Sequence, residues 1–356
     1  MATFYTSPSI HHVVTGSVYE EILVSYAGKE NVGVRYRLYA GQQHVVVETS
    51  AGPLDLSGPR SKDVFVRFKA ALNNNGVFYT DENGMEMKQR AMYWRPWAPV
   101  YSDPDFPVAC NFYPMTTIAS FGDAHAHLSI LSSNSHSAGA MIDGAIDIMF
   151  HRLWFHDSKV EAPNTPITAS FYLHLGPSSN FENQRRPLSC RLLNAPLFFA
   201  APSLTALVPS GSLLAAPLPP ELHLLSLQQI PVNLSEVLDN IQPSQPGVVL
   251  ARFLHIFPKA NSTHGVATIS NISSLFKKMS PLKAEEYTID GIRPMAEAQE
   301  SRLLWLRQTG GTEREFEQAK VSLESVEHAD WAGEAVTVAN MEIRTFRLQL
   351  STPGGD

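Results

Sequence analysis

In the stretch Val34-Arg35-Tyr36-Arg37-Leu38-Tyr39, large apolar or aromatic side chains alternate with arginines. A period of two places one set of side chains on a buried face and the other in water, which is the pattern of a β-strand. Residues 127–131, 167–175 and 341–348 show much the same alternation. The sequence therefore predicts an all-β protein.

Turn signals separate these stretches. The dipeptides are Asn75-Gly76, Asn83-Gly84, Asp143-Gly144 and Asp290-Gly291. Helical periodicity is scarce and favours only two short helices, at 297–306 and 313–326. The first of these could equally be a strand at 302–306.

The same patterns predict the domain organisation. We expect an untethered N-terminus at 1–16, a β-sandwich at 17–190 and a Pro-rich connector at 191–220. A second β domain should follow at 221–350, with a disordered tail at 351–356.

The longest uncharged stretch, from Leu192 to Pro220, is long enough to cross a bilayer. It carries six prolines, each of which would interrupt a membrane helix, so we predict an extended connector and no membrane span. The N-terminus has neither a basic region nor an apolar region, so no signal peptide is predicted on this chain.

Composition excludes several classes of protein. The 356 residues include 27 Lys and Arg against 34 Asp and Glu, a net charge of -7 that disfavours nucleic-acid binding. Cys110 and Cys190 allow at most one disulfide and cannot build a four-thiolate zinc site. The sequence also lacks a nucleophile elbow, a phosphate-binding loop and a dinucleotide-binding turn.

Histidines are the first candidates for chemistry. His125 and His127 lie two residues apart and could serve a metal, but we favour the interpretation that both face solvent beside Asp123. His151 and His156 could line a pocket, although hydrogen-bonded strand histidines are the favoured interpretation.

Acidic and aromatic residues are the next candidates. Glycoside hydrolysis needs two carboxylates flanking one bond, and the spacing singles out no such pair. Asp81, which precedes Glu82-Asn83-Gly84, is interpreted as a turn former. The aromatic runs at 93–97 and 112–114 could stack on sugars, but the pattern favours core packing slightly.

Several of these segments carry a family resemblance. The segment Gly76-Val77-Phe78-Tyr79-Thr80-Asp81-Glu82-Asn83-Gly84-Met85-Glu86 resembles a strand-turn-strand element of class II α-mannosidases, glycoside hydrolase family 38. Residues 90–96, 109–114, 128–149 and 218–227 resemble further elements of that family, the last from its lysosomal branch. Met341-Glu342-Ile343-Arg344-Thr345-Phe346 matches a signature of the same branch. The similar elements follow one another in order from about 18 to 347.

The resemblance implies a galactose-mutarotase-like β-supersandwich followed by a smaller C-terminal β-sandwich. It also implies that the chain is the C-terminal domain of an α-mannosidase that hydrolyses terminal α-D-mannose residues of N-glycan oligosaccharides. In that family the zinc ligands, the nucleophile and the acid/base residue belong to an N-terminal barrel. We therefore expect no catalytic residue, no bound zinc and no activity in the isolated chain.

Partners and location follow from the same resemblance. The expected partners are the N-terminal catalytic polypeptide and a mannose-containing oligosaccharide, with no nucleic acid. The family's first sandwich strands have no counterpart before Tyr19, so we expect exposed edge backbone and apolar surface. The location implied is lysosomal, vacuolar or secretory, and sequons at Asn233, Asn261 and Asn271 support it faintly.

The family's C-terminal domain lends only rim residues to the sugar site. The resemblance places such a role on Tyr113, or on Phe112 if the register shifts, on Asp157 in an altered loop and on Gln228, where the family has an arginine nearby. That loop has lost its glycines, which argues for weakened substrate contact.

Two alternatives stay open. The chain could be a non-catalytic carbohydrate-binding or interaction module derived from the enzyme. It could also be an independent enzyme that uses histidine and carboxylate pairs for proton transfer at a sugar's anomeric centre.

Overall fold

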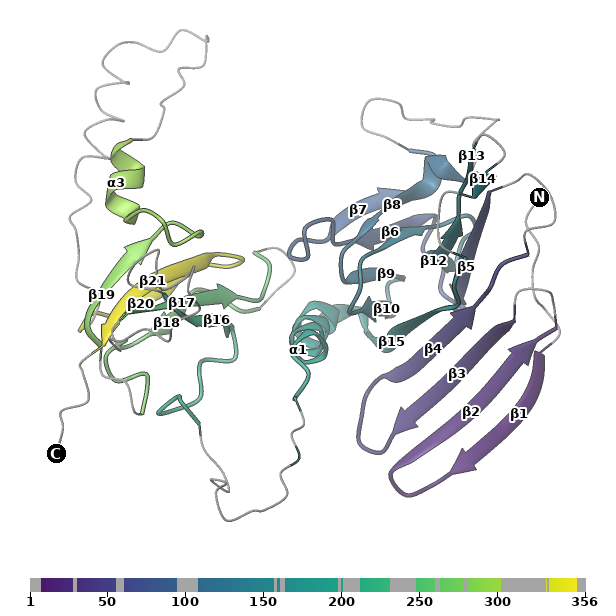
Figure 1. Ribbon diagram of the computed structural model, residues 1–356, viewed down its shortest axis with the longest axis horizontal. Coiled ribbons are helices and arrows are strands. Elements are labelled where there is room, and N and C mark those ends of the chain that lie inside the picture. The colour runs from purple at the N-terminus through teal and green to yellow at the C-terminus, as the bar shows by residue number, and fades with distance from the viewer. Residues whose placement is uncertain are drawn as a thin grey trace, which may run out of the picture. The chain divides into compact units, whose positions relative to one another are not determined.

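The computed structural model describes residues 8–27, 31–55, 61–94, 108–156, 159–160, 164–197, 200, 212–230, 248–259, 263–277, 281–301, 331 and 333–350. The chain divides into two compact units, Met1–Pro196 and Leu197–Asp356. Both units consist largely of antiparallel sheets, which confirms the predicted all-β class (Figure 1).

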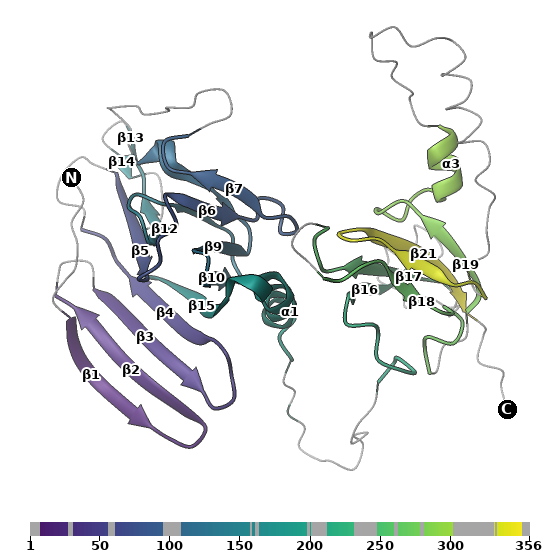
Figure 2. The same ribbon diagram turned by 180° about the vertical axis from the view of Figure 1, so that it is seen from behind.

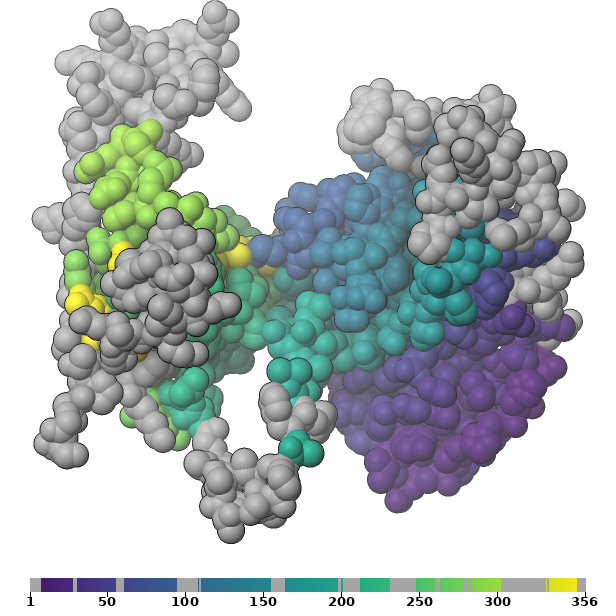
Figure 3. Space-filling model, in the orientation of Figure 1, coloured from purple at the N-terminus to yellow at the C-terminus, as the bar shows by residue number. Residues whose placement is uncertain are grey.

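The larger sheet of the first unit has nine antiparallel strands. In spatial order they are β1 (Pro8–Thr15), β2 (Tyr19–Tyr26), β3 (Val32–Tyr39), β4 (Val45–Ala51), β15 (Ile167–Pro177), β10 (Ala126–Ser132), β9 (Ile118–Gly122), β6 (Val77–Thr80) and β7 (Lys88–Ala91). Figure 3 shows the N-terminal strands, in purple, forming one end of this unit.

The second sheet of this unit is smaller. Its four strands are, in order, β5 (Lys62–Lys69), β12 (Ala145–Leu153), β11 (His136–Gly139) and β8 (Phe112–Met115). A short hairpin joins β13 (Phe155–His156) to β14 (Lys159–Val160), and short 3-10 turns cover Ala109–Asn111 and Ser178–Asn180.

The core of the first unit lies between the two sheets. Phe78, Phe121, Ile130 and Phe171 from the larger sheet are fully buried and join Ile146 from the smaller sheet in one apolar cluster. Fully burying side chains of this kind contributes about 1.5–3 kcal/mol each. The alternating stretches of the sequence therefore supply one inner face to each sheet, as a sandwich requires.

The N-terminal segment differs from the prediction. Residues 8–15, expected to be untethered, form β1, which pairs along its length with β2. A bulge between Ile10 and His12 puts Ile10 and Val13 on the same face although they are three residues apart. This bulge breaks the alternation on which the sequence argument depended, and so the strand was missed.

The sequence argument also missed helix α1 (Phe181–Leu193), which packs on the outer face of the larger sheet against β10 and β15 (Figure 2). Its buried residues are mostly polar and include Glu182, Arg185, Arg186 and Ser189. A helix whose buried face is polar gives no apolar period of 3.6, which is the signal that predicts helices.

The second unit is a smaller sandwich. Its four-stranded sheet has the order β16 (Leu222–Gln229), β17 (Val248–His255), β21 (Ile343–Leu350) and β19 (Pro281–Tyr287), and its two-stranded sheet pairs β18 (Ala267–Ile269) with β20 (Val336–Val338). Buried residues of both sheets, among them Phe253, Phe346, Ile269 and Val336, form one core. The predicted C-terminal β-sandwich is thus present.

The structure describes only some of the segments on which the remaining predictions fall. A short helix, α3 (Met295–Glu300), covers the start of the helix predicted at 297–306. The helix predicted at 313–326 and the tail at 351–356 lie outside the described residues. Cys110 and Cys190 are both thiols, and burial raises the pKa of Cys190. No helix in the described ranges is long and apolar enough to cross a membrane.

Candidate functional site

Tyr113, the first candidate rim residue, lies in the core of the first unit. Its ring packs edge-on against Phe78 at 5.7 Å between centroids, and the Arg90 guanidinium lies 4.5 Å from the ring centre. Its hydroxyl donates to the carbonyl oxygen of Trp94 at 3.3 Å. Arg90 is held in turn by an ion pair with Glu82 at 2.6 Å. Tyr113 therefore ties β8 to the backbone at Trp94 through its hydroxyl, which is its only polar side-chain group.

The neighbours of Tyr113, Asn111 and Phe112, also make structural contacts. The Asn111 amide oxygen accepts a hydrogen bond from the Tyr93 backbone at 2.7 Å, and Tyr93 has a left-handed φ of 53°. Phe112, the second candidate, is half-buried and packs on Phe65 with 5.0 Å between ring centroids. Trp94 is exposed at the end of this cluster. The cluster presents aromatic surface at Phe112 and Trp94, which can contact a ligand by stacking.

The other two candidate rim residues are Asp157 and Gln228. Asp157 lies outside the described residues. Gln228 is exposed near the end of β16, in the second unit. The side chain of His156 also lies outside the description, whereas His151 is buried and burial lowers its pKa.

Asp81 is more than the turn former that the sequence suggested. Its carboxylate is fully buried and accepts hydrogen bonds from the backbone amides of Thr116, Thr117 and Ile118 at 2.8–3.1 Å, and from the Thr117 hydroxyl. Burial nevertheless raises its pKa. Asp81 thus holds the turn between β8 and β9 and has no open side from which to reach a substrate.

The segment 341–346 is likewise structural. Met341 takes a left-handed φ of 62°, and the Glu342 carboxylate accepts the Ala339 amide at 2.7 Å. Arg344 forms a bidentate ion pair with Glu286, with 2.8 Å between Nε and Oε1 and 2.5 Å between Nη2 and Oε2. These contacts tie β21 to β19 and to the turn that enters it.

A buried polar layer under α1 was not predicted. Arg185 is completely buried, donates to the Ser120 hydroxyl at 2.9 Å and forms an ion pair with Glu182. His127 is buried too, and its ring stacks on Phe181 with centroids 4.1 Å apart. The expectation that His127 faces solvent is therefore wrong, because α1 covers it. His125 is exposed, as expected.

Burial determines the charge of this layer. Desolvation, together with the positive charge of Arg185, lowers the pKa of His127 to about 4. Burial also lowers the pKa of His44 and of His174. These histidines are thus neutral at neutral pH; Arg185 reinforces this at His127 and His174, and Arg191 does so at His44.

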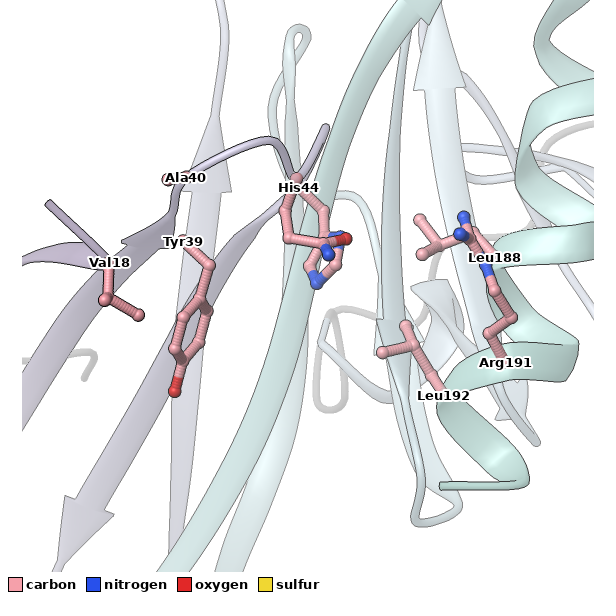
Figure 4. Close-up of a pocket in the computed structure, with 8 residues that line it drawn as sticks. Val18, Tyr39, Ala40, His44, Leu188, Arg191 and Leu192 are labelled. Atoms are coloured by element: carbon pink, nitrogen blue, oxygen red, sulfur yellow. The ribbon is translucent and has the colours of Figure 1, made fainter. Parts of the chain in front are cut away.

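A hollow of about 440 Å³ opens at the edge of this layer. Figure 4 shows Tyr39 and His44 on one side and Leu188, Arg191 and Leu192 of α1 on the other. Its lining is mixed and it holds one cationic side chain, so it offers general surface contact without an acid/base pair.

The described residues do not fit a zinc site. Nowhere in the described ranges do three His, Cys, Asp or Glu side chains come together as a metal ion would require. His125 and His127, which the sequence offered as a possible pair, differ in environment, since one is exposed and the other is covered by Phe181.

Comparison with known proteins agrees with the two-sheet architecture. Residues 2–159 match the model of the glycosyl hydrolases family 38 C-terminal domain. This part of the chain belongs to that family. Asp81, Asn111 and Tyr113, which lie in the segments that carry the resemblance, are buried anchors in the structure described above.

Similarity to α-mannosidases extends beyond the matched residues. The lysosomal alpha-mannosidases of Mus musculus and Homo sapiens are each 28% identical over 329 and 331 residues, which is 87% of this chain and 30% of each relative. An alpha-mannosidase structure from Enterococcus faecalis superposes with a TM-score of 0.54 over 96% of this chain and 35% of its own, at 10% identity, which shows a shared fold. The chain thus spans about a third of the length of these α-mannosidases.

Proposed function

We propose that this chain is the C-terminal structural domain of a zinc-dependent α-mannosidase, acting with an N-terminal catalytic polypeptide on terminal α-D-mannose residues of N-glycans. The main support is the similarity to α-mannosidases along 87% of the chain. The buried positions of Asp81, Asn111 and Tyr113 agree with a structural domain, since their contacts stabilise it.

In this proposal, zinc and the reacting groups belong to the catalytic polypeptide. Tyr113, Phe112, Asp157 and Gln228 remain the proposed rim positions, and Trp94 adds exposed aromatic surface. A lysosomal or vacuolar location is part of the proposal, because the mouse and human relatives are lysosomal enzymes.

The test is reconstitution of activity. The full chain alone should not hydrolyse p-nitrophenyl α-D-mannoside. With zinc and the N-terminal polypeptide of the mouse relative, ending where its similarity to this chain begins, hydrolysis should exceed that of the polypeptide alone. Activity of the isolated chain, or no gain on mixing, would refute the proposal.

A second candidate function is a carbohydrate-binding module without catalysis. The supporting observation is that Trp94 and Trp154 are exposed, each near an arginine-bearing strand. Titration of the chain with a mannose oligosaccharide should then show weak binding that Trp94→Ala or Trp154→Ala abolishes. Binding that both variants retain would count against this candidate.

A further inference from the structure

The inner face of the nine-stranded sheet is covered over only part of its width. Phe171, Val47, Tyr36, Ile22 and Val13 are direct cross-strand neighbours in one row across β15, β4, β3, β2 and β1. Their exposed fractions rise along that row: 0%, 1%, 37%, 40% and 59%. Because directly paired residues point to the same face, the last three continue the core face of the sheet into the open.

Other apolar residues widen this surface. Leu38 pairs with Val45, and Ile10 pairs with Val24, so both lie on the same inner face, and both are exposed. We call the five exposed residues the inner patch: Ile10, Val13, Ile22, Tyr36 and Leu38. A shallow groove of about 210 Å³ runs along it.

The opposite face of the same strands is polar. Glu21 pairs with Arg37 in an ion pair of 2.5 Å, and Arg35 bonds Glu48 at 2.8 Å. Strands β2 and β3 are therefore amphipathic, with the charged face outward and the apolar face toward the side on which the second sheet lies. An antiparallel sheet of this kind normally has its apolar face packed on a core.

The covering sheet stops short of the inner patch. Strand β8 contacts β6, and β12 contacts β9 and β15, so β5 lies toward β4 and is the last strand of the smaller sheet as described. Figures 1 and 2 both show β1, β2 and β3 extending beyond β5. Strands lie about 4.8 Å apart within a sheet, so two or three strands added beside β5 would cover β1–β3.

We propose that the inner patch and the outer edge of β5 form a docking surface for β-strands of the N-terminal mannosidase polypeptide, which would extend the smaller sheet over β1–β3. This inference rests on the proposed function and specifies where its partner binds. The occupant follows from two observations. The surface continues a sandwich core, which a strand with alternating apolar residues fits, and the relatives have about 70% of their length outside the part that this chain spans.

The experiment mixes the full chain with the N-terminal polypeptide of the mouse relative defined above. Complex formation is measured by sedimentation velocity, and hydrogen–deuterium exchange is compared in the free and bound chain. We expect slower exchange in β1, β2, β3 and β5 on binding. Ile22→Glu should weaken binding at least tenfold, because the interface would bury an unpaired carboxylate.

Ile142→Glu is the matched control. Ile142 has the same residue type and the same 40% exposure, but it lies in the turn before β12, away from the patch. This variant should bind as the unmodified chain does. Both variants replace exposed side chains, and an unchanged exchange pattern in the core strands of each free variant would show that it folds.

The outcomes separate the two proposals. If a complex forms and activity appears, but Ile22→Glu binds normally and β1–β3 stay unprotected, the docking surface is refuted and the proposed function stands. If no complex forms, both are refuted. If the chain instead forms a dimer that Ile22→Glu dissociates and the N-terminal polypeptide does not, a second copy occupies the patch and the proposed docking site is wrong.

Discussion

Protonation of His127 should weaken the first unit at acidic pH. The imidazole is buried between β10 and α1, stacked on Phe181, and its Nδ1 atom has no hydrogen-bond partner in the described residues. The groups that act on its charge are Arg185, which disfavours protonation, and Asp123, which favours it. Burial is the largest cause, and with these two charges it lowers the pKa to about 4 in the folded chain, against 6.5 for an ordinary histidine.

The sign and size of the effect follow from this difference. Because the folded pKa is lowered, the unfolded chain binds a proton first as the pH falls below 6.5, and stability is lost until the pH reaches about 4. Each pKa unit corresponds to about 1.4 kcal/mol, so protonation of His127 should cost the first unit about 2–3 kcal/mol between pH 7.5 and pH 4.5. His44 and His174, with pKa values also lowered by burial, add losses of the same sign.

Urea unfolding at a series of pH values measures this loss. Hydrogen exchange of peptides from β9, β10 and β15 reports on the first unit separately from the second. We expect His127→Phe, which keeps a ring to stack on Phe181, to lose about 2–3 kcal/mol less than the unmodified chain between pH 7.5 and pH 4.5. The exposed neighbour provides the control, since His125→Phe should leave the pH dependence unchanged.

The reasoning would be refuted by equal pH dependence in His127→Phe and the unmodified chain. That result would mean that the imidazole takes up its proton as readily in the folded as in the unfolded state. A variant that fails to fold at pH 7.5 would show instead that the polar edge of the ring, and not its stacking, is essential, which also contradicts the reasoning.

Three further substitutions test the packing. Glu182→Gln should destabilise the first unit by about 3 kcal/mol in urea unfolding at pH 7.5, because it leaves the fully buried Arg185 without its counter-charge. A change below about 0.5 kcal/mol would show that Arg185 does not need the charge of Glu182. Gly139→Ala should destabilise the first unit by about 1–3 kcal/mol, since an added Cβ would lie 2.4 Å from the Asn111 carbonyl oxygen. Gly265→Ala, with open space around it, should leave the thermal melt unchanged. Equal melting temperatures for the two variants would refute the steric argument. Tyr113→Phe should cost about 1 kcal/mol by removing the bond to the Trp94 carbonyl, and hydrogen exchange should accelerate at residues 93 and 94; unchanged exchange there would show that the bond does not hold this segment.

Much of the fold could be predicted from local sequence patterns. The alternation in 34–39, 167–175 and 341–348 corresponds to strands β3, β15 and β21. The resemblance to family 38 was confirmed by the match over residues 2–159. Both signals are local or ordered along the chain, and neither depends on which residues meet in space.

The sequence-based predictions fail where a bulge interrupts the alternation of apolar residues or where the buried face of an element is polar. The bulge at Ile10 and His12 hides the period of β1. The polar buried face of α1 hides a helix, and the same helix covers His127, which the sequence placed in solvent. Asp81, interpreted from the sequence as a turn former, is also a buried anchor of the turn between β8 and β9, because hydrogen-bond partners distant in sequence cannot be read from spacing.

The sequence by itself determined the all-β class, the turns and the family, since these depend on short-range periodicity and on ordered runs of residue types. Only the tertiary structure decided which apolar face stays uncovered. Ile22 and Tyr36 have the same pattern as core residues, and their exposure depends on where the opposing sheet ends at β5. Solvent exposure depends on how two sheets pack against each other, so the sequence of a single strand cannot determine it.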